Sequence, residues 1–210
     1  MRMEDPLQRY AALLLEWNLR VNLTAARTMD EVKAHLDDAL GLLTLDWAGV
    51  DEVVDIGSGG GLPGIPIAIR LPRMRVTLVE ASLRKVAFLQ HVAGTLELGN
   101  VTVLAERAED LGRDGRFREK FDRAVSRAAA RPAVVLELAL PLVRPGGDLL
   151  AEVARLEPQS LSIPAARLGG GAPGLEHLPG GKTVLRVRKI TPTPDAYPRR
   201  AGMPNRRPLN

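Results

Sequence analysis

A glycine-rich segment is the part of this sequence best suited to binding a ligand. Residues 53–64 read Val-Val-Asp-Ile-Gly-Ser-Gly-Gly-Gly-Leu-Pro-Gly and lie between an apolar run and a helical pattern. The glycines leave the backbone uncovered, so a flat or extended ligand can lie directly against it. A turn that served only to pack the chain would not need so many, because glycine loses more conformational entropy on folding than any other residue.

Two ligand classes fit this segment. A dinucleotide uses G-x-G-x-x-G after a strand, and that pattern is supplied by Gly59, Gly61 and Gly64. S-adenosylmethionine sites use an acidic residue followed by G-x-G-x-G, and that pattern is supplied by Asp55, Gly57, Gly59 and Gly61. The glycines alone therefore do not separate the two ligands.

The acidic residues favour S-adenosylmethionine. Asp55, at the end of the first predicted strand, would repel a pyrophosphate, whereas it would attract the ammonium and sulfonium groups of S-adenosylmethionine. Glu80 ends the next predicted strand, where its carboxylate can accept hydrogen bonds from both ribose hydroxyls. We therefore predict S-adenosylmethionine as the cofactor, with an NAD-dependent dehydrogenase as an alternative.

Two further groups follow later strands. The run Arg107-Ala108-Glu109-Asp110 comes after the third strand, where a backbone amide and a carboxylate could read an adenine ring. Arg127 ends the fourth strand, where open α/β sheets bind their ligands, and could pair with a cofactor carboxylate or a substrate phosphate. Surface charges with no ligand are the alternative for both groups.

The residue types that are missing narrow the chemistry. The sequence has no Cys, which excludes disulfides, thiolate zinc sites and the Cys nucleophile of cytosine C5 methylation. The three His are scattered, so we expect no metal site.

The Asn- or Asp-Pro-Pro-aromatic turn of adenine amino methylation does not follow the fourth strand. A guanine N7 lone pair needs no proton removal, so proximity and orientation suffice. The absence of an obvious base fits that acceptor and fits a binding protein equally.

The elements that must position these residues form an alternating pattern. Amphipathic spacing predicts a first helix through Leu7, Tyr10, Leu14 and Trp17, and a Thr28–Glu31 capping box starts a second. Beyond these, strands alternate with helices, which is typical of βαβ units and a parallel sheet. The predicted strands are 52–56, 75–80, 101–105, 121–126, 148–152 and 183–190, the last at a sheet edge, and the predicted helices are 64–71, 83–97 and 133–143.

Composition and charge indicate one globular domain with a basic end. Hydrophobic residues make up 45% and charged residues 26%, and no apolar run approaches the ~18 residues that a membrane span needs. The charged N-terminal stretch does not match a signal peptide, so we expect a cytoplasmic protein.

Residues 182–210 hold eight basic residues and one acidic residue, which indicates a polyanionic partner or a solvated tail. The Gly/Pro-rich stretch 158–181 predicts a loop, either a flap or an inert connector.

Motifs along nearly the whole chain resemble those of the bacterial 16S rRNA guanine-N7 methyltransferases called glucose-inhibited division protein B. The most specific are the Leu-Pro-Gly extension of the glycine segment and the run Tyr197-Pro198-Arg199-Arg200-Ala201-Gly202-Met203-Pro204. The others are Glu16-Trp17-Asn18, Val21-Asn22-Leu23-Thr24-Ala25, His35-Leu36-Asp37-Asp38, Glu80-Ala81-Ser82, Lys85-Val86-Ala87-Phe88-Leu89, Arg107-Ala108-Glu109 and Ser126-Arg127-Ala128.

The resemblance implies an α/β Rossmann-like S-adenosylmethionine-dependent methyltransferase fold, with a seven-stranded, mostly parallel sheet. It implies methyl transfer to N7 of one guanine of 16S rRNA, in the small ribosomal subunit near the decoding centre. We further predict a helical extension (residues 1–48), a methyltransferase domain (49–210) and a monomer. The cofactor residues it implies, together with those of the glycine pattern, are Asp55, Gly57, Gly59, Gly61, Leu62, Glu80, Ala81, Ser82, Ala108, Glu109 and Arg127. It places RNA near His35, Arg199 and Arg200, and Arg127 is the best catalytic candidate in a mechanism by proximity.

The chain departs from the family pattern at two places. The family commonly has a Met-Lys-Gly turn after the fifth strand, whereas this chain has Ala151-Glu152-Val153-Ala154, and a carboxylate at Glu152 would repel RNA. The family's Asp-Ser-Leu is Asp38-Ala39-Leu40 here. These departures leave two alternatives open, namely a methyltransferase for another RNA or a protein, and a non-catalytic RNA-binding module that retains the pocket.

Overall fold

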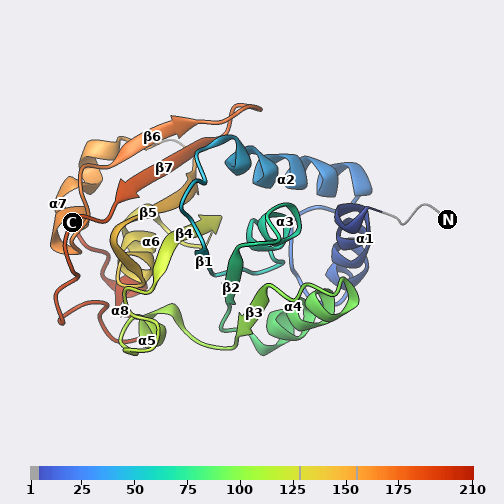
Figure 1. The fold of residues 1–210 in the computed structure, drawn as a ribbon, viewed down its shortest axis with the longest axis horizontal. Coiled ribbons are helices and arrows are strands. Elements are labelled where there is room, and N and C mark those ends of the chain that lie inside the picture. Colours follow the sequence, from blue (N-terminus) through green and yellow to red (C-terminus); the bar gives the residue numbers. More distant parts are fainter. Residues whose placement is uncertain (1–4, 128, 155) are drawn as a thin grey trace.

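A computed structural model describes residues 5–127, 129–154 and 156–210, and its described strands form one sheet (Figure 1). The strand order is β3-β2-β1-β4-β5-β7-β6. Strands β1 to β5 pair in parallel, whereas β7 runs antiparallel to both β5 and β6. Their bounds are β1 (Glu52–Ile56), β2 (Arg75–Val79), β3 (Val101–Leu104), β4 (Phe121–Arg127), β5 (Val143–Val153), β6 (Gly174–His177) and β7 (Thr183–Arg188).

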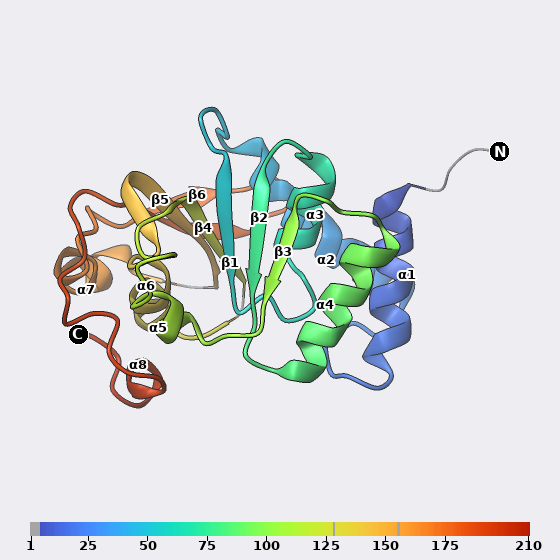
Figure 2. The same cartoon turned by 60° about the horizontal axis from the view of Figure 1, so that its bottom comes forward.

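Helices cover both faces of the sheet (Figure 2). One face packs on α1 (Pro6–Asn18), α2 (Met29–Gly41), α3 (Gly64–Arg70) and α4 (Leu83–Thr95). The other face packs on α5 (Ala108–Leu111), α6 (Pro132–Ala139) and α7 (Ser162–Arg167), with α8 (Met203–Arg206) against α6. Short 3-10 turns lie at Leu42–Thr44 and Pro158–Leu161. Neighbouring residues of a strand point to opposite faces of the sheet. Val53 therefore packs in the core on the side of α1 to α4, and Val54 packs in the core on the side of α5 to α7.

The connections place a crevice between β1 and β4. From β1 the chain moves outward to β2 and β3, and it then returns to the other side of β1 to form β4. The loops that leave β1 and β4 therefore diverge at their carboxyl ends, which is where open α/β sheets bind ligands. The glycine segment leaves β1 at this point.

The buried parallel strands were predicted well from the sequence. The predicted strand 52–56 matches β1, and the ends of β2, β3 and β4 differ from prediction by one residue each. The fifth strand is longer than predicted, since β5 begins at Val143 rather than at Asp148. The predicted helix 133–143 was too long at its end, because α6 ends at Ala139. The Thr28–Glu31 capping box is confirmed, with the Glu31 amide donating to the Thr28 hydroxyl and the Glu31 carboxylate accepting from the Thr28 amide.

Two predictions in the second half were wrong. Strand 183–190 was expected at an edge, but β7 lies between β5 and β6, and the short strand β6 forms the edge. The stretch 158–181 was expected to be a loop, but it contains the 3-10 turn Pro158–Leu161, α7 and β6. Pro164 and Ala165 of α7 are buried against α6, so this stretch is part of the core rather than a flap. The many Gly and Pro residues favoured a loop prediction, whereas the short elements of this stretch depend on tertiary contacts.

A buried lysine ties the segment after β7 to the core. The Lys189 ammonium donates to the Leu140 carbonyl at 2.6 Å and pairs with the Glu119 carboxylate at 3.1 Å. The same carboxylate accepts from the Thr193 amide. Burial lowers the pKa of Lys189 to about 8, while Glu119 opposes that shift.

No helix within the described ranges is both long and apolar enough to cross a membrane.

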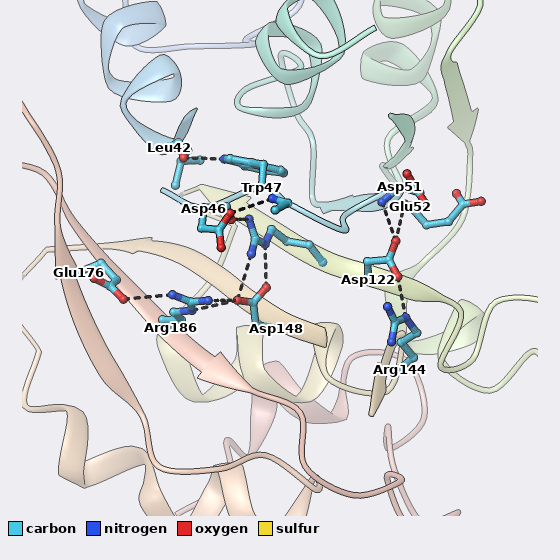
Figure 3. A network of polar contacts seen from close by, with 12 residues as sticks. Leu42, Asp46, Trp47, Asp51, Glu52, Asp122, Arg144, Asp148, Glu176 and Arg186 are labelled. Atoms are coloured by element: carbon cyan, nitrogen blue, oxygen red, sulfur yellow. Dashed lines mark hydrogen bonds and ion pairs between the residues drawn. The ribbon is translucent and has the colours of Figure 1, made fainter. Parts of the chain in front are cut away.

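A second buried ion network joins β4, β5 and β7 to the turn before β1 (Figure 3). The Asp148 carboxylate accepts from Arg123 at 2.7 Å and from Arg186 at 2.9 Å, and Asp148 is only 2% exposed. Arg123 also donates to the Asp46 carbonyl, and its guanidinium lies 4.5 Å from the centre of the Trp47 ring. The network thereby joins the helical N-terminal part to the sheet.

Removing Asp148 should therefore leave the Arg123 charge buried without its partner. We predict that Asp148→Asn lowers the free energy of unfolding by ~3–5 kcal/mol. The control is Glu176→Gln at the half-exposed end of the same network, which should cost less than ~1 kcal/mol. Urea unfolding of both variants measures the difference, and equal small losses would show that Asp148 does not hold the network together.

Candidate functional site

A pocket of about 610 Å³ opens at the carboxyl ends of the central strands. This volume is in the range of small-molecule and cofactor sites. Its walls come from the connector before α2, from α2, from the loops after β1, β2, β3 and β4, and from α6 and α8. Segments far apart in the sequence therefore meet around one cavity.

The glycine segment forms the floor of this pocket. Gly57 has φ = +69°, and a Cβ atom there would lie 2.8 Å from the side chain of Ala129. Gly64 begins α3, and a Cβ atom there would lie 2.7 Å from the carboxylate of Asp55. Both positions thus require glycine, the first for its left-handed backbone and the second for close packing of helix on strand.

Asp55 lies beneath the floor rather than in the pocket. Its side chain is fully buried, and Oδ2 accepts from the Gly64 amide at 2.9 Å while Oδ1 has no partner among the described residues. Burial raises the pKa of Asp55 to about 7, and the nearby Glu80 charge raises it further, against the opposing effect of the Gly64 amide. We predicted Asp55 as a cofactor residue, and the structure places it as a support of the loop.

The N-terminal helices hold the floor and supply one wall. The Tyr10 hydroxyl of α1 donates to the Gly60 carbonyl at 2.6 Å. The Asn18 amide group makes four hydrogen bonds to the connector, two as a donor to the Thr24 and Ala26 carbonyls and two as an acceptor from the Leu23 and Thr24 amides. Leu23, Thr24 and Ala25 line the pocket, so Asn18 fixes a wall that it does not itself form.

Glu80 is oriented by the backbone on both of its oxygens. Oε2 accepts from the Gly59 amide at 3.0 Å, and Oε1 accepts from the Ser82 amide at 2.8 Å. A carboxylate has about four acceptor sites, so two remain for a ligand. This geometry suits a pair of neighbouring hydroxyls, as in a ribose.

The loop after β3 meets the C-terminal segment. Glu109 is 3% exposed and accepts from the Gly202 amide at 2.8 Å, which brings α8 to the pocket. Asn205 of α8 lines the pocket together with Ala108 and Leu138. RNA contact was predicted for Arg199 and Arg200 of this segment, whereas its contribution to the pocket was not predicted.

Arg127 lies at the centre of a compensated charge cluster. Its guanidinium donates to the His35 carbonyl at 2.9 Å and pairs with Glu152 at 3.3 Å and with Asp38 at 3.7 Å. Lys182, in the turn between β6 and β7, pairs with Asp38 at 3.0 Å and with Glu152 at 3.6 Å. Glu152 was expected to repel RNA, and in the structure Arg127 and Lys182 together balance the charges of Glu152 and Asp38.

His35 faces the pocket beside this cluster. Its Nδ1 lies 2.9 Å from the Thr24 hydroxyl, and the residue lines the cavity. Burial lowers the pKa of His35, and the neighbouring Arg127 charge lowers it further, although Asp38 opposes this. Burial and the Arg127 charge therefore favour the neutral imidazole of His35. A hydrogen bond from neutral His35 to an RNA phosphate would bring no positive charge to that phosphate.

The structure brings most of the predicted cofactor residues to the pocket lining, namely Gly57, Gly59, Leu62, Glu80, Ala81, Ala108, Glu109 and Arg127. Three lie outside the lining, namely Asp55, Gly61 and Ser82. Ala128 of the Ser126-Arg127-Ala128 motif lies outside the described residues. Arg107, from the run that was expected near an adenine ring, also lines the pocket. The lining residues that were not predicted individually as site residues are Leu23, Thr24, Ala25, Ile56, Ser58, Gly60, Val79, Lys85, Glu106, Ala129, Leu138 and Asn205.

Arg199 and Arg200 differ in their surroundings. The Arg199 guanidinium holds the fully buried Glu137 carboxylate at 2.6 Å and also donates to the Arg207 carbonyl. Arg200 is exposed. The structure therefore gives Arg199 a structural partner that the sequence did not predict, while RNA contact by either arginine stays a prediction.

The arrangement can hold an extended ligand with a vicinal diol. It offers a floor of glycine backbone without side chains, a pre-oriented carboxylate at Glu80, and an apolar position at Ala108 beyond it. Cationic side chains of Lys85 and Arg107 also line it. No Ser–His or Cys–His pair suited to nucleophilic catalysis lies in the lining within the described ranges.

Comparisons with known proteins agree on a family and a fold. The GidB family model, described as rRNA small subunit methyltransferase G, matches residues 3–157. A Roseiflexus castenholzii protein named Ribosomal RNA small subunit methyltransferase G is 42% identical over 222 residues, covering 99% of this chain and 92% of that protein. A Chloroflexus aggregans protein of the same name is 43% identical over 212 residues, covering 96% and 88%.

Solved structures support the fold at low identity. A SAM-dependent methyltransferase from Aquifex aeolicus superposes with a TM-score of 0.56 at 14% identity, over 75% of this chain and 93% of that one. A T. thermophilus 16S rRNA N2 methyltransferase in complex with AdoMet and guanosine gives 0.54 at 18% identity, over 76% and 40%. The predicted α/β Rossmann-like methyltransferase fold is thus confirmed.

The raised pKa of Asp55 predicts a pH-dependent stability. An Asp carboxyl has an ordinary pKa of 3.8, so between that value and about 7 the folded state holds a proton that the unfolded state has lost. The stability that this proton contributes is complete below the lower value and is lost as the pH rises through the upper one. Relative to Asp55→Asn, the wild type should lose unfolding free energy from pH 5 to pH 8. Urea unfolding across this range tests it, and a constant difference would contradict it.

Proposed function

The chain belongs to the rRNA small subunit methyltransferase G family, and from this premise we propose that it transfers a methyl group from S-adenosylmethionine to N7 of a guanine in 16S rRNA near the decoding centre. The observation that carries the proposal is the pocket at the glycine segment, with Glu80 fixed on both oxygens beside a glycine backbone that no side chain covers. The family match supplies the substrate class.

The residues of the pocket fit this cofactor. Gly57, Gly59 and Leu62 would lie along it, Glu80 would accept from the ribose hydroxyls, and Ala108 with Glu109 would face the adenine. When bound, S-adenosylmethionine supplies an electrophilic methyl group. Asp55 acts through the Gly64 amide and keeps the floor in place.

The chain's own contribution is to position the acceptor. The N7 lone pair of guanine lies in the plane of the base and needs no general base, so orientation and proximity supply the catalysis. Arg127 binds Asp38, Glu152 and the His35 carbonyl, which leaves it suited to hold α2 and the pocket wall. We therefore assign Arg127 a positioning role rather than a direct one.

We propose further that the substrate is the small ribosomal subunit or its 16S rRNA, and that the chain acts as a monomer in the cytoplasm. Residues 1–48 would form a helical extension of a methyltransferase domain at 49–210. The basic residues in 182–210 support an RNA partner, because phosphate contacts dominate nucleic-acid affinity.

Transfer of labelled methyl groups tests the function. Small subunits that lack the guanine-N7 mark are incubated with the protein and labelled S-adenosylmethionine, and the modified nucleotide is mapped. Label on that guanine supports the proposal. Label elsewhere indicates another RNA position or substrate, whereas cofactor binding without transfer to any RNA indicates a non-catalytic module. Binding of NAD in place of S-adenosylmethionine would contradict the cofactor assignment.

Glu80→Ala should weaken binding of S-adenosylmethionine because it removes a charged acceptor from the ribose. The expected cost is ~1.5–3 kcal/mol, and isothermal titration measures it. Glu106→Ala is the matched control, since Glu106 also lines the pocket but makes no hydrogen bond to the glycine segment in the described residues. An equal loss for both variants would contradict the assigned role of Glu80.

Neighbouring arginines should respond differently to substitution. Arg200→Ala should weaken rRNA binding and reduce the slope of log affinity against log salt by roughly 0.7–0.9, as expected for one lost phosphate contact. Arg199→Ala should instead destabilise the fold by about 2–4 kcal/mol, because it leaves the buried Glu137 carboxylate unpaired. Filter binding at several salt concentrations and urea unfolding separate the two. A stable Arg199→Ala protein with weak RNA binding would reverse the assignment.

A further inference from the structure

One wall of the pocket comes from the C-terminal segment. Within the described part of the chain, Asn205 is the one lining residue beyond Leu138. It lies in α8, which both views place beside α5, the helix that carries Ala108 and Glu109 (Figures 1 and 2). The hydrogen bond from the Gly202 amide to Glu109 fixes this proximity.

The backbone around Asn205 is held firmly while its side chain is free. Arg131 donates to the Asn205 carbonyl at 3.2 Å, and Pro204 on one side and Leu209 on the other are buried. The side-chain amide of Asn205 is exposed and makes no hydrogen bond to any other described residue. A fixed backbone with an uncommitted amide at a pocket wall is suited to reading a ligand.

The order of the strands identifies the part of the ligand that lies there. The glycine segment follows β1, Glu80 follows β2, and Ala108 and Glu109 follow β3, which is the next strand along the same sheet edge. A nucleoside whose ribose lies on Glu80 therefore places its base toward Ala108 and α8.

Building on the proposed function, we propose that Asn205 reads the adenine ring of the cofactor. An adenine edge presents an amino donor beside a ring-nitrogen acceptor, and a carboxamide offers the complementary acceptor and donor. Glu109 cannot supply this pair, because a carboxylate only accepts and one of its oxygens already binds the Gly202 amide. Asn205 would thus add a paired donor and acceptor to the contacts that the loop after β3 makes with the base.

Titration calorimetry of the full chain with two ligands tests this role. The ligands are S-adenosylhomocysteine and the analogue whose purine lacks the 6-amino group. The wild type should prefer S-adenosylhomocysteine by about fivefold to tenfold, as expected for neutral hydrogen bonds. Asn205→Ala should abolish most of this preference, whereas Asn210→Ala, an exposed asparagine of the same segment that does not line the pocket, should keep it.

The outcomes separate this inference from the proposed function. An Asn205→Ala protein that keeps the wild-type preference overturns the role of Asn205. Equal weakening of both ligands also overturns it, since α8 would then only shape the pocket. A wild-type protein that binds neither ligand contradicts the proposed function itself, whatever Asn205 does.

Discussion

The floor of the pocket must be both uncovered and rigid, and most of the surrounding structure serves that requirement. A side chain on the ligand side would cover the glycine backbone, so the segment is held from behind and from its edges. Three groups do this, namely the Tyr10 hydroxyl at Gly60, the Asp55 carboxylate at Gly64 and the Glu80 carboxylate at Gly59. They come from α1, from β1 and from the residue that follows β2, so three separate parts of the chain hold the loop. Rigidity gained in this way reduces the ordering cost of binding a ligand.

This requirement explains why the N-terminal helices cannot be separated from the site. Tyr10 is fully buried, and Asn18 fixes the connector that forms a wall of the pocket. A Cβ atom on Gly60 would meet the Leu23 carbonyl at 3.2 Å, so wall and floor touch directly. A helical extension in the sequence thus becomes part of the binding site in the fold. Its helices pack on the same core as α3 and α4.

The sequence predicted those parts of the fold and site that local patterns determine. Buried parallel strands have apolar runs and defined ends, and the glycine segment and Glu80 follow them at fixed spacing, so both were found. The strand β6 was missed because it is a short, polar edge strand that exists only by pairing with β7. The position of Asn205 in the pocket wall was missed because it depends on long-range contacts of the C-terminal segment, such as the Gly202–Glu109 hydrogen bond, which spans 93 residues. Arg199 was taken for a surface cation because its partner Glu137 is an acidic residue in an apolar helix far away in the sequence.

Glu152 is another residue whose surroundings depend on distant segments and could not be predicted from the local sequence. From the sequence alone, the Glu152 carboxylate near the position of a common family lysine predicted a surface that repels RNA. In the sheet, however, β5 pairs antiparallel with β7, so Glu152 lies opposite Val184 and next to the turn that carries Lys182. Arg127 of the parallel neighbour β4 approaches from the other side. Glu152 is thereby paired with one cation from the end of β4 and one from the turn before β7, both of which also pair with Asp38. The local charge of this rim follows from strand pairing, which no single segment of the sequence records.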